Sequence, residues 1–170
     1  AYGSNKVLKV ALNDKGLAQN TTEASVFNDK ATSPAIAKVF RNRSIGGQVF
    51  WLISEIGRPL TSEKEFSSIM GFEWKTYEDL MYYFSKGRGG NNLKTAVQAL
   101  QAIYAKNLKH FQDIGKQSNV VYYGKRIEDL KKVANSQFVA GILVAMKSHK
   151  LLYADLATVD HYGKNAAGKV

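Results

Sequence analysis

Apolar residues recur at helical spacing along much of the chain, and this pattern predicts a mainly α protein. The clearest example is residues 93–114, where apolar positions repeat every three or four residues and polar side chains occupy the other side. Residues 48–56 are almost continuously apolar and precede Gly57, which favours a buried helix ended by a glycine. We therefore predict a helical bundle with a three-helix, helix-turn-helix-like unit and an irregular N-terminal arm.

The N-terminal arm has the weakest pattern. Residues 5–12 fit either a short strand or one turn of helix. Residues 13–35 are rich in Asn, Asp, Thr and Ser, so we predict irregular structure with a short strand near residues 24–27. Such an arm either lies over its own domain or reaches a neighbouring subunit.

A helix start signal follows the arm, because Ser33 precedes Pro34. We predict that this helix continues to the Gly46-Gly47 pair. The two glycines either kink the helix or let another backbone or a phosphate come close, since a basic stretch precedes them.

The residue pattern over 44–85 predicts three helices joined by two short turns. Thr61 or Ser62 is the predicted cap of the next helix, and Glu65, three residues past Ser62, matches a capping box. Gly71 supplies a turn residue free to adopt positive φ. Thr76 is a candidate cap for the next helix. Ser67 is the small residue expected where the two helices cross. The apolar residues expected to hold the second helix against the first are Phe72, Tyr77 and Leu80.

The run GRPLTSEKEFSSIMGFEWKTYEDL resembles the helix-turn-helix of winged-helix and phage-repressor-like DNA-binding domains. The resemblance implies that the second helix of the motif enters the major groove. Three acids fall among the positions it would expose, and acids repel phosphates, so the alternative is a purely architectural unit. These positions are Glu73, Trp74, Lys75, Thr76, Glu78, Asp79 and Tyr82.

A flexible, basic linker is predicted at residues 85–94, where Gly, Asn, Lys and Arg dominate. It divides the chain after the helix-turn-helix-like unit. The predicted organisation is an arm over 1–35, that unit over 36–87, and a basic helical half with a mobile tail over 88–170.

Two alternatives stay open in the basic half. Residues 118–125 fit a turn or a short β segment. Residues 126–153 form either one long helix or two helices with a turn at Asn135-Ser136, and in the second case a strand begins near residue 151. The stretch 138–146 is apolar almost all round, which favours a place in the core or in a subunit contact.

Composition narrows the function classes. Of the 170 residues, 45% are apolar, which is enough for a core, and no apolar run is long enough for a membrane span. The first residues lack the long apolar region of a signal peptide. The chain has no cysteine, which excludes disulfides, thiolate nucleophiles and cysteine-rich zinc sites.

Charge points to a polyanion. The net charge is +10, and residues 91–170, with twelve basic and five acidic residues, carry most of it. Nucleic acid is the commonest polyanion, while acidic proteins and anionic membranes are competing partners. Bases can also stack on exposed rings beside basic loops. The candidate rings are Tyr82, Tyr83, Phe84, Tyr122 and Tyr123.

Catalytic and cofactor motifs give no candidate. The three histidines lack metal-ligand spacing, and no Walker loop, dinucleotide fingerprint or G-x-S-x-G motif occurs. We therefore assign no catalytic residue, metal ligand or cofactor, and the sequence leans against an enzyme. A small all-α hydrolase or toxin domain, lysozyme-like or nuclease, is one alternative, with Glu55, Glu63 or Glu65 as its acid. A basic protein–protein interaction module is another.

The leading hypothesis is a non-enzymatic nucleic-acid-binding protein that contacts mostly phosphates, with DNA favoured over RNA. It is either a helix-turn-helix regulator or replication factor, or a viral structural protein that coats nucleic acid. The expected location is the cytoplasm or a virion, without a membrane partner. Homo-oligomers would form through the arm or residues 138–146. The candidate contact residues are Lys75, Lys86, Arg88, Lys94, Lys125, Arg126, Lys131 and Lys132.

Overall fold

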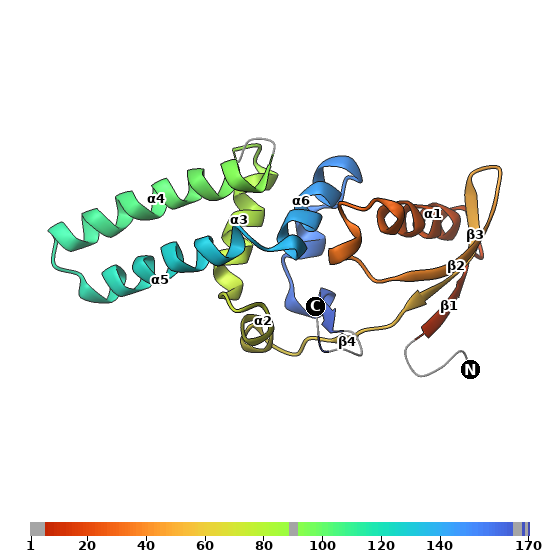
Figure 1. The fold of residues 1–170 in the computed structure, drawn as a ribbon, viewed down its shortest axis with the longest axis horizontal. Helices are drawn as coiled ribbons and strands as arrows, with labels where there is room; N and C mark the ends of the chain where they lie inside the picture. The colour runs from red at the N-terminus through yellow and green to blue at the C-terminus, as the bar shows by residue number, and fades with distance from the viewer. Residues whose placement is uncertain (1–5, 89–91, 165–167, 169) are drawn as a thin grey trace.

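The computed structural model describes residues 6–88, 92–164, 168 and 170, and it is mainly α, as predicted. Figure 1 shows three parts along the longest axis of the molecule. A small sheet with one helix lies at one end, a pair of long antiparallel helices at the other, and a helical core between them. None of the described helices is long and apolar enough to cross a membrane.

The N-terminal part is a β-α-β-β unit. The strand alternative for residues 5–12 is confirmed, whereas the predicted irregular structure over residues 13–35, with a short strand near 24–27, is wrong because most of this stretch is helix. Strand β1 (Lys6–Val10) is followed by helix α1 (Asp14–Asn28). The Asn13 side chain accepts a hydrogen bond from the backbone N–H of Gly16 and so caps α1. Helix α1 then buries Ala24 and Val26, so that packing stabilises a helix whose own amphipathic pattern is weak.

The two helices predicted between residues 34 and 56 are also wrong. After the short 3₁₀ helix η1 (Ser33–Ala35), the chain forms strands β2 (Val39–Ile45) and β3 (Gln48–Glu55). Gly46 and Gly47 both have positive φ and make the tight turn between them. A short continuous apolar run fits a strand as well as a helix, and here the Gly-Gly pair decides for a hairpin.

The three strands form one antiparallel sheet in the order β1-β3-β2. Helix α1 packs on one face of this sheet, where Ala24, Val49 and Leu52 form a small buried cluster with Val39 against it. A separate two-stranded pairing joins β4 (Arg58–Pro59) to β5 (Gly163–Lys164) and so ties the end of the chain to the segment after β3.

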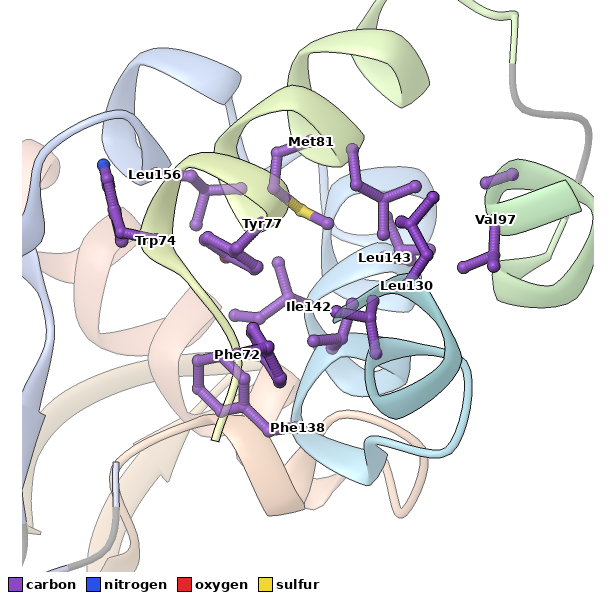
Figure 2. Packing of buried hydrophobic residues seen from close by; sticks show 14 of the residues in the cluster. Phe72, Trp74, Tyr77, Met81, Val97, Leu130, Phe138, Ile142, Leu143 and Leu156 are labelled. Carbon is purple, nitrogen blue, oxygen red and sulfur yellow. The ribbon is translucent and has the colours of Figure 1, made fainter. Parts of the chain in front are cut away.

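The helical core forms where the sequence predicts helices after residue 60. Helix α2 (Glu63–Met70) is capped by the Ser62 hydroxyl and ends at Gly71, which adopts the left-handed conformation, as predicted. Helix α3 (Trp74–Ser85) begins before Thr76, so the prediction of Thr76 as its cap is wrong. Figure 2 shows side chains of α3, α5 and α6 converging on one apolar cluster around Tyr77.

Helix α4 (Leu93–Asp113) matches the predicted amphipathic helix, and its partner α5 (Gln117–Val133) replaces the predicted turn or β segment at 118–125. The two helices pack along each other and extend away from the core (Figure 1). Part of the predicted linker, residues 89–91, lies outside the described residues.

Helix α6 (Gln137–Ser148) begins after Asn135-Ser136, which confirms the two-helix alternative. Its apolar segment lies in the core, with Val139 and Ile142 buried. The short helices η2 (Tyr153–Leu156) and η3 (Val159–His161) follow, so no strand begins near residue 151. In the predicted mobile tail, residues 165–167 and 169 lie outside the described part of the chain.

Candidate nucleic-acid interface

The face of the sheet opposite α1 is left open. Residues that pair across antiparallel strands project to the same face. One cross-strand row joins Leu8, Ile53 and Arg41, and the next joins Val10, Trp51 and Arg43. Leu8 is 45% exposed and Val10 is 55% exposed, so no described segment covers β1 on this side, whereas Ile53 on the central strand is buried.

Strand β1 shows the difference between the two faces. Lys9 lies on the α1 side, where its ammonium group is 2.7 Å from the Glu23 carboxylate. Lys6 is exposed and belongs to a third row on the open face, opposite Glu55. The Lys6 ammonium group lies 4.4 Å from the centre of the Phe40 ring.

Four cations lie on or beside the open face. Lys38 contacts the same Phe40 ring from 5.2 Å, while Arg41 and Arg43 project from β2 and are exposed. Within the described parts of the chain, none of these two lysines and two arginines has a carboxylate within ion-pair distance. We name Lys6, Lys38, Arg41 and Arg43, with the apolar residues Leu8, Val10, Trp51 and Ile53, the open sheet face.

The candidate cations predicted from the sequence lie elsewhere, and most of them are paired within the protein. Lys75 lies 2.6 Å from Glu78 and Lys131 lies 2.6 Å from Glu128, while Lys125 pairs with Glu73. The Glu78 carboxylate raises the pKa of Lys75, and the Glu73 carboxylate raises the pKa of Lys125. These lysines are held by carboxylates of their own molecule.

Lys132 is likewise held within the protein. Its ammonium group donates a 2.8 Å hydrogen bond to the carbonyl oxygen of Gly71 and lies 3.9 Å from the Asp129 carboxylate. It therefore fastens α5 to the turn that follows α2.

Arg126 is a buried structural residue, because only 5% of it is exposed. Its guanidinium group donates hydrogen bonds to the hydroxyls of Thr76 and Tyr122 and lies 3.7 Å from the Asp79 carboxylate. The Tyr104 hydroxyl donates to the same Asp79 carboxylate over 2.7 Å, and burial raises the pKa of Tyr104. This network joins α3, α4 and α5.

Asp129 completes the network at the start of α3. Its carboxylate accepts hydrogen bonds from the backbone N–H of Glu73, over 3.0 Å, and from the Thr76 hydroxyl. Helix α3 therefore takes its cap from α5, and the side chain of its own cap residue, Glu73, bonds to Lys125 and does not cap the helix.

The remaining candidate cations lie near the start of α4. Lys86 lies 5.2 Å from the centre of the Tyr82 ring, and Arg88 follows two residues later. Lys94 lines a groove of about 660 Å³ together with Lys147 of α6. The structure brings these cations to the side of the helical core, away from the sheet.

Helix α3 presents few of the positions that the helix-turn-helix resemblance implies are exposed. Trp74 and Thr76 are buried, and only Lys75 and Tyr82 of that set are well exposed. At the turn between α2 and α3, the Ser67 hydroxyl accepts a hydrogen bond from the backbone N–H of Trp74 over 3.0 Å. Helices α4, α5 and α6 pack against α3, so α3 is part of the helical core.

The residues considered for hydrolysis do not converge on one site. Glu65 accepts hydrogen bonds from Thr61 and pairs with Arg58 and Lys164, and Lys164 is the main cause that lowers the pKa of Glu65 to about 2. Glu63 is exposed on the first turn of α2. Glu55 lines a cavity of about 610 Å³ between the sheet unit and the helical core, where His161 also lies. A carboxylate with a pKa of about 2 is ionised at neutral pH, which is unsuited to a general acid.

Comparison of this chain with protein-family models, with curated proteins and with solved structures finds no match. Functional inference therefore rests on the geometry of the chain itself.

Sequence reasoning missed the open sheet face, although a signal for it was present. Arg41 and Arg43 precede Gly46-Gly47, and the pattern of that basic stretch predicts a helix that is kinked at the two glycines or approached there by another backbone or a phosphate. Alternate residues of a strand share one face, so the spacing of the two arginines places both on the same side once β2 is recognised. Two glycines between apolar runs are a hairpin signal, and this signal identifies β2 and therefore the open sheet face.

Proposed function

We propose that this protein binds nucleic acid without catalysing a reaction, and that the open sheet face is its contact surface. The observation that carries the proposal is a set of four cations without carboxylate partners among the described residues, beside exposed apolar side chains on one uncovered face. Unpaired cations attract phosphates because binding releases the counterions condensed on the nucleic acid.

Charge also argues for a polyanion over a second copy of the chain. Face-to-face packing of two sheets would bring Arg41 and Arg43 of both copies together, and like charges in a desolvated contact oppose association. An exposed apolar surface of this kind, rimmed by cations, marks an interaction site. The helix-turn-helix surface and the cations near the start of α4 are weaker candidates, because α3 is packed into the core.

The test is binding of labelled random-sequence DNA and RNA, single-stranded and double-stranded, across a salt series. We expect binding that weakens log-linearly with salt, because phosphate contacts release counterions. The double variant Arg41→Ala/Arg43→Ala should bind at least tenfold more weakly, and its salt slope should fall by about 1.4–1.8 for two lost phosphate contacts.

The matched control is Lys125→Ala/Lys131→Ala, which removes the same net charge from lysines that are paired within the protein. We expect its affinity to stay within about twofold of the unmodified protein, because distant surface charges are screened. Equal losses in the two double variants would show that only net charge matters, and absence of binding at low salt would overturn the proposal.

A further inference from the structure

Trp51 stands apart from the other aromatic residues of the protein. The chain has two tryptophans, and Trp74 is 3% exposed and packed against Phe66, Tyr77 and Tyr162. Trp51 lies in the centre of the open sheet face and is partly exposed. Among the residues that the structure describes, none makes a ring or cation contact with Trp51.

We propose that the open sheet face binds single-stranded nucleic acid, with a base stacked on Trp51 and the backbone held by Arg41 and Arg43. This inference rests on the proposed function and names the form of nucleic acid. Bases stack on a ring without regard to sequence, because every base has a flat π-face.

The composition of the two central rows favours unpaired bases. Leu8, Ile53 and Val10 have no group that can hydrogen-bond the base edges of a duplex, which is how sequence is read in a groove. Ile53 is buried, whereas the exposed Leu8 and Val10 can contact unstacked bases, whose faces are apolar. In a duplex the flat faces are covered by neighbouring base pairs, so Trp51 would have nothing on which to stack.

The cations lie where a backbone beside the stacked base would run. Arg43 is the cross-strand partner of Trp51, and Arg41 is the partner of Ile53 one row further along. Residues two apart on a strand are separated by about 6.6 Å. An extended single strand places successive phosphates at a comparable spacing, so the two guanidinium groups can hold neighbouring phosphates.

Phe40 differs from Trp51 in a way that limits the stacking site to one ring. The ammonium groups of Lys6 and Lys38 both lie over the Phe40 ring. This arrangement holds the two lysines close to the sheet, where they add positive charge at the end of the face that lies near Glu55. In the described rows of the open sheet face, Trp51 is therefore the ring that carries no ammonium group.

Intrinsic tryptophan fluorescence tests the inference directly. Oligo(dT) and a random-sequence duplex of equal length would be titrated into the full chain at low salt. We expect oligo(dT) to quench the emission and the duplex to quench it little. In the variant Trp51→Phe the remaining emission comes from the buried Trp74 and should not change on titration, while the ring of phenylalanine retains most of the affinity.

The variant Trp51→Leu should bind oligo(dT) about tenfold more weakly, because it loses one base–aromatic stack. The control is Tyr82→Leu, since Tyr82 is an exposed ring on α3 in the helical core, away from the sheet. Circular dichroism and thermal unfolding of each variant show whether the fold is retained.

The outcomes separate this inference from the proposed function. Salt-dependent binding that needs Arg41 and Arg43 but is unchanged in Trp51→Leu would overturn the stacking inference alone. Duplex binding as tight as oligo(dT) binding, without quenching, would do the same. Absence of any binding would overturn both proposals.

Discussion

The cations of α5 and those of the open sheet face have the same chemistry and different partners. Lys125 and Lys131 lie against carboxylates, Lys132 is bonded to the turn after α2, and Arg126 is buried among hydroxyls and Asp79. The cations of β2 project into solvent and have no described carboxylate within reach. The former stabilise the fold, and we propose that the latter bind a ligand.

The difference teaches that the number of charges does not locate a binding surface. Residues 91–170 carry most of the net charge, yet several of their cations are held by acids contributed from earlier in the chain, such as Glu73 and Asp79. Those acids are more than 40 residues away in sequence, so only the fold reveals the pairing. An arginine that lacks a partner is the more informative residue.

Removal of the buried arginine is the strongest test of this comparison. Arg126→Ala leaves the Thr76 and Tyr122 hydroxyls without their donor and leaves Asp79 with Lys75 as its one remaining cation among the described residues, so we expect the free energy of unfolding to fall by about 2–4 kcal/mol. Urea unfolding followed by circular dichroism measures it. Where the variant is still folded, its affinity for oligo(dT) should be unchanged.

Lys131→Ala is the control for that variant, because it removes an exposed lysine from the same helix. Its ion pair with Glu128 is solvent-exposed, and we expect a change within about 0.5 kcal/mol. A stable Arg126→Ala protein that has lost its nucleic-acid affinity would reverse our division between structural and binding cations.

A smaller effect is expected at the junction of the two regions. A methyl group on Gly141 of α6 would lie 3.0 Å from the Ala35 Cβ and 3.2 Å from the Ala31 carbonyl oxygen, in the segment that joins α1 to β2. We therefore expect Gly141→Ala to destabilise the protein by about 1–3 kcal/mol through overpacking. Thermal unfolding monitored by circular dichroism measures the change.

Gly124 gives the matched control, because a methyl group there would meet only the Leu108 Cδ1 atom, at 3.9 Å. It lies inside α5, and alanine is the better helix former, so Gly124→Ala should stabilise the protein by up to about 1 kcal/mol. Equal effects of the two substitutions would show that α6 and the α1–β2 segment are not tightly packed.

The smallest predicted effect concerns the stability contributed by a paired carboxylate, that of Glu65. The folded state lowers the pKa of Glu65 from 4.5 to about 2, chiefly through Lys164, so its contribution to stability is present above pH 4.5 and is lost as the pH falls towards 2. Thermal unfolding between pH 6 and pH 2 should show a shallower decline for Glu65→Gln than for the unmodified protein.

Glu63→Gln is the control, since Glu63 lies on the same helix and has no ion pair among the described residues. Its stability should follow the pH dependence of the unmodified protein. An identical decline in all three proteins would mean that the contacts of Glu65 do not stabilise the fold.

The sequence predicts the helical core better than the sheet unit, and the reason is physical. Helix α2 can be predicted from Ser62 and Gly71, because the first caps its start and the second ends it, as expected. Helix α1 has a weak apolar stripe, and its stability comes from contact with β3, which is distant in sequence. Near its end, strand β3 is apolar on both faces, because Leu52 and Ile53 are both buried. The alternation of apolar and polar residues that identifies a half-exposed strand is therefore absent.

The candidate site also depends on contacts between residues that are distant in sequence. A long-range pairing such as Lys125 with Glu73 cannot be read from residue spacing, so the predicted contact residues included cations that the fold neutralises. The rows of the open sheet face depend on strand register, and register follows once the hairpin turn is identified. The resemblance of residues 44–85 to a helix-turn-helix stays a prediction, and the first of its three expected helices is replaced by strand β3.

The small cluster under the sheet has a consequence for motion. Ala24, Val49 and Leu52 form a much smaller buried cluster than the core around Tyr77, so we expect the sheet unit to open locally at a lower free energy than α3 or α6. Its backbone amides therefore exchange with solvent deuterium sooner. A ligand that binds only the closed sheet slows that exchange by mass action, and the stability of the sheet unit thus depends on what it holds.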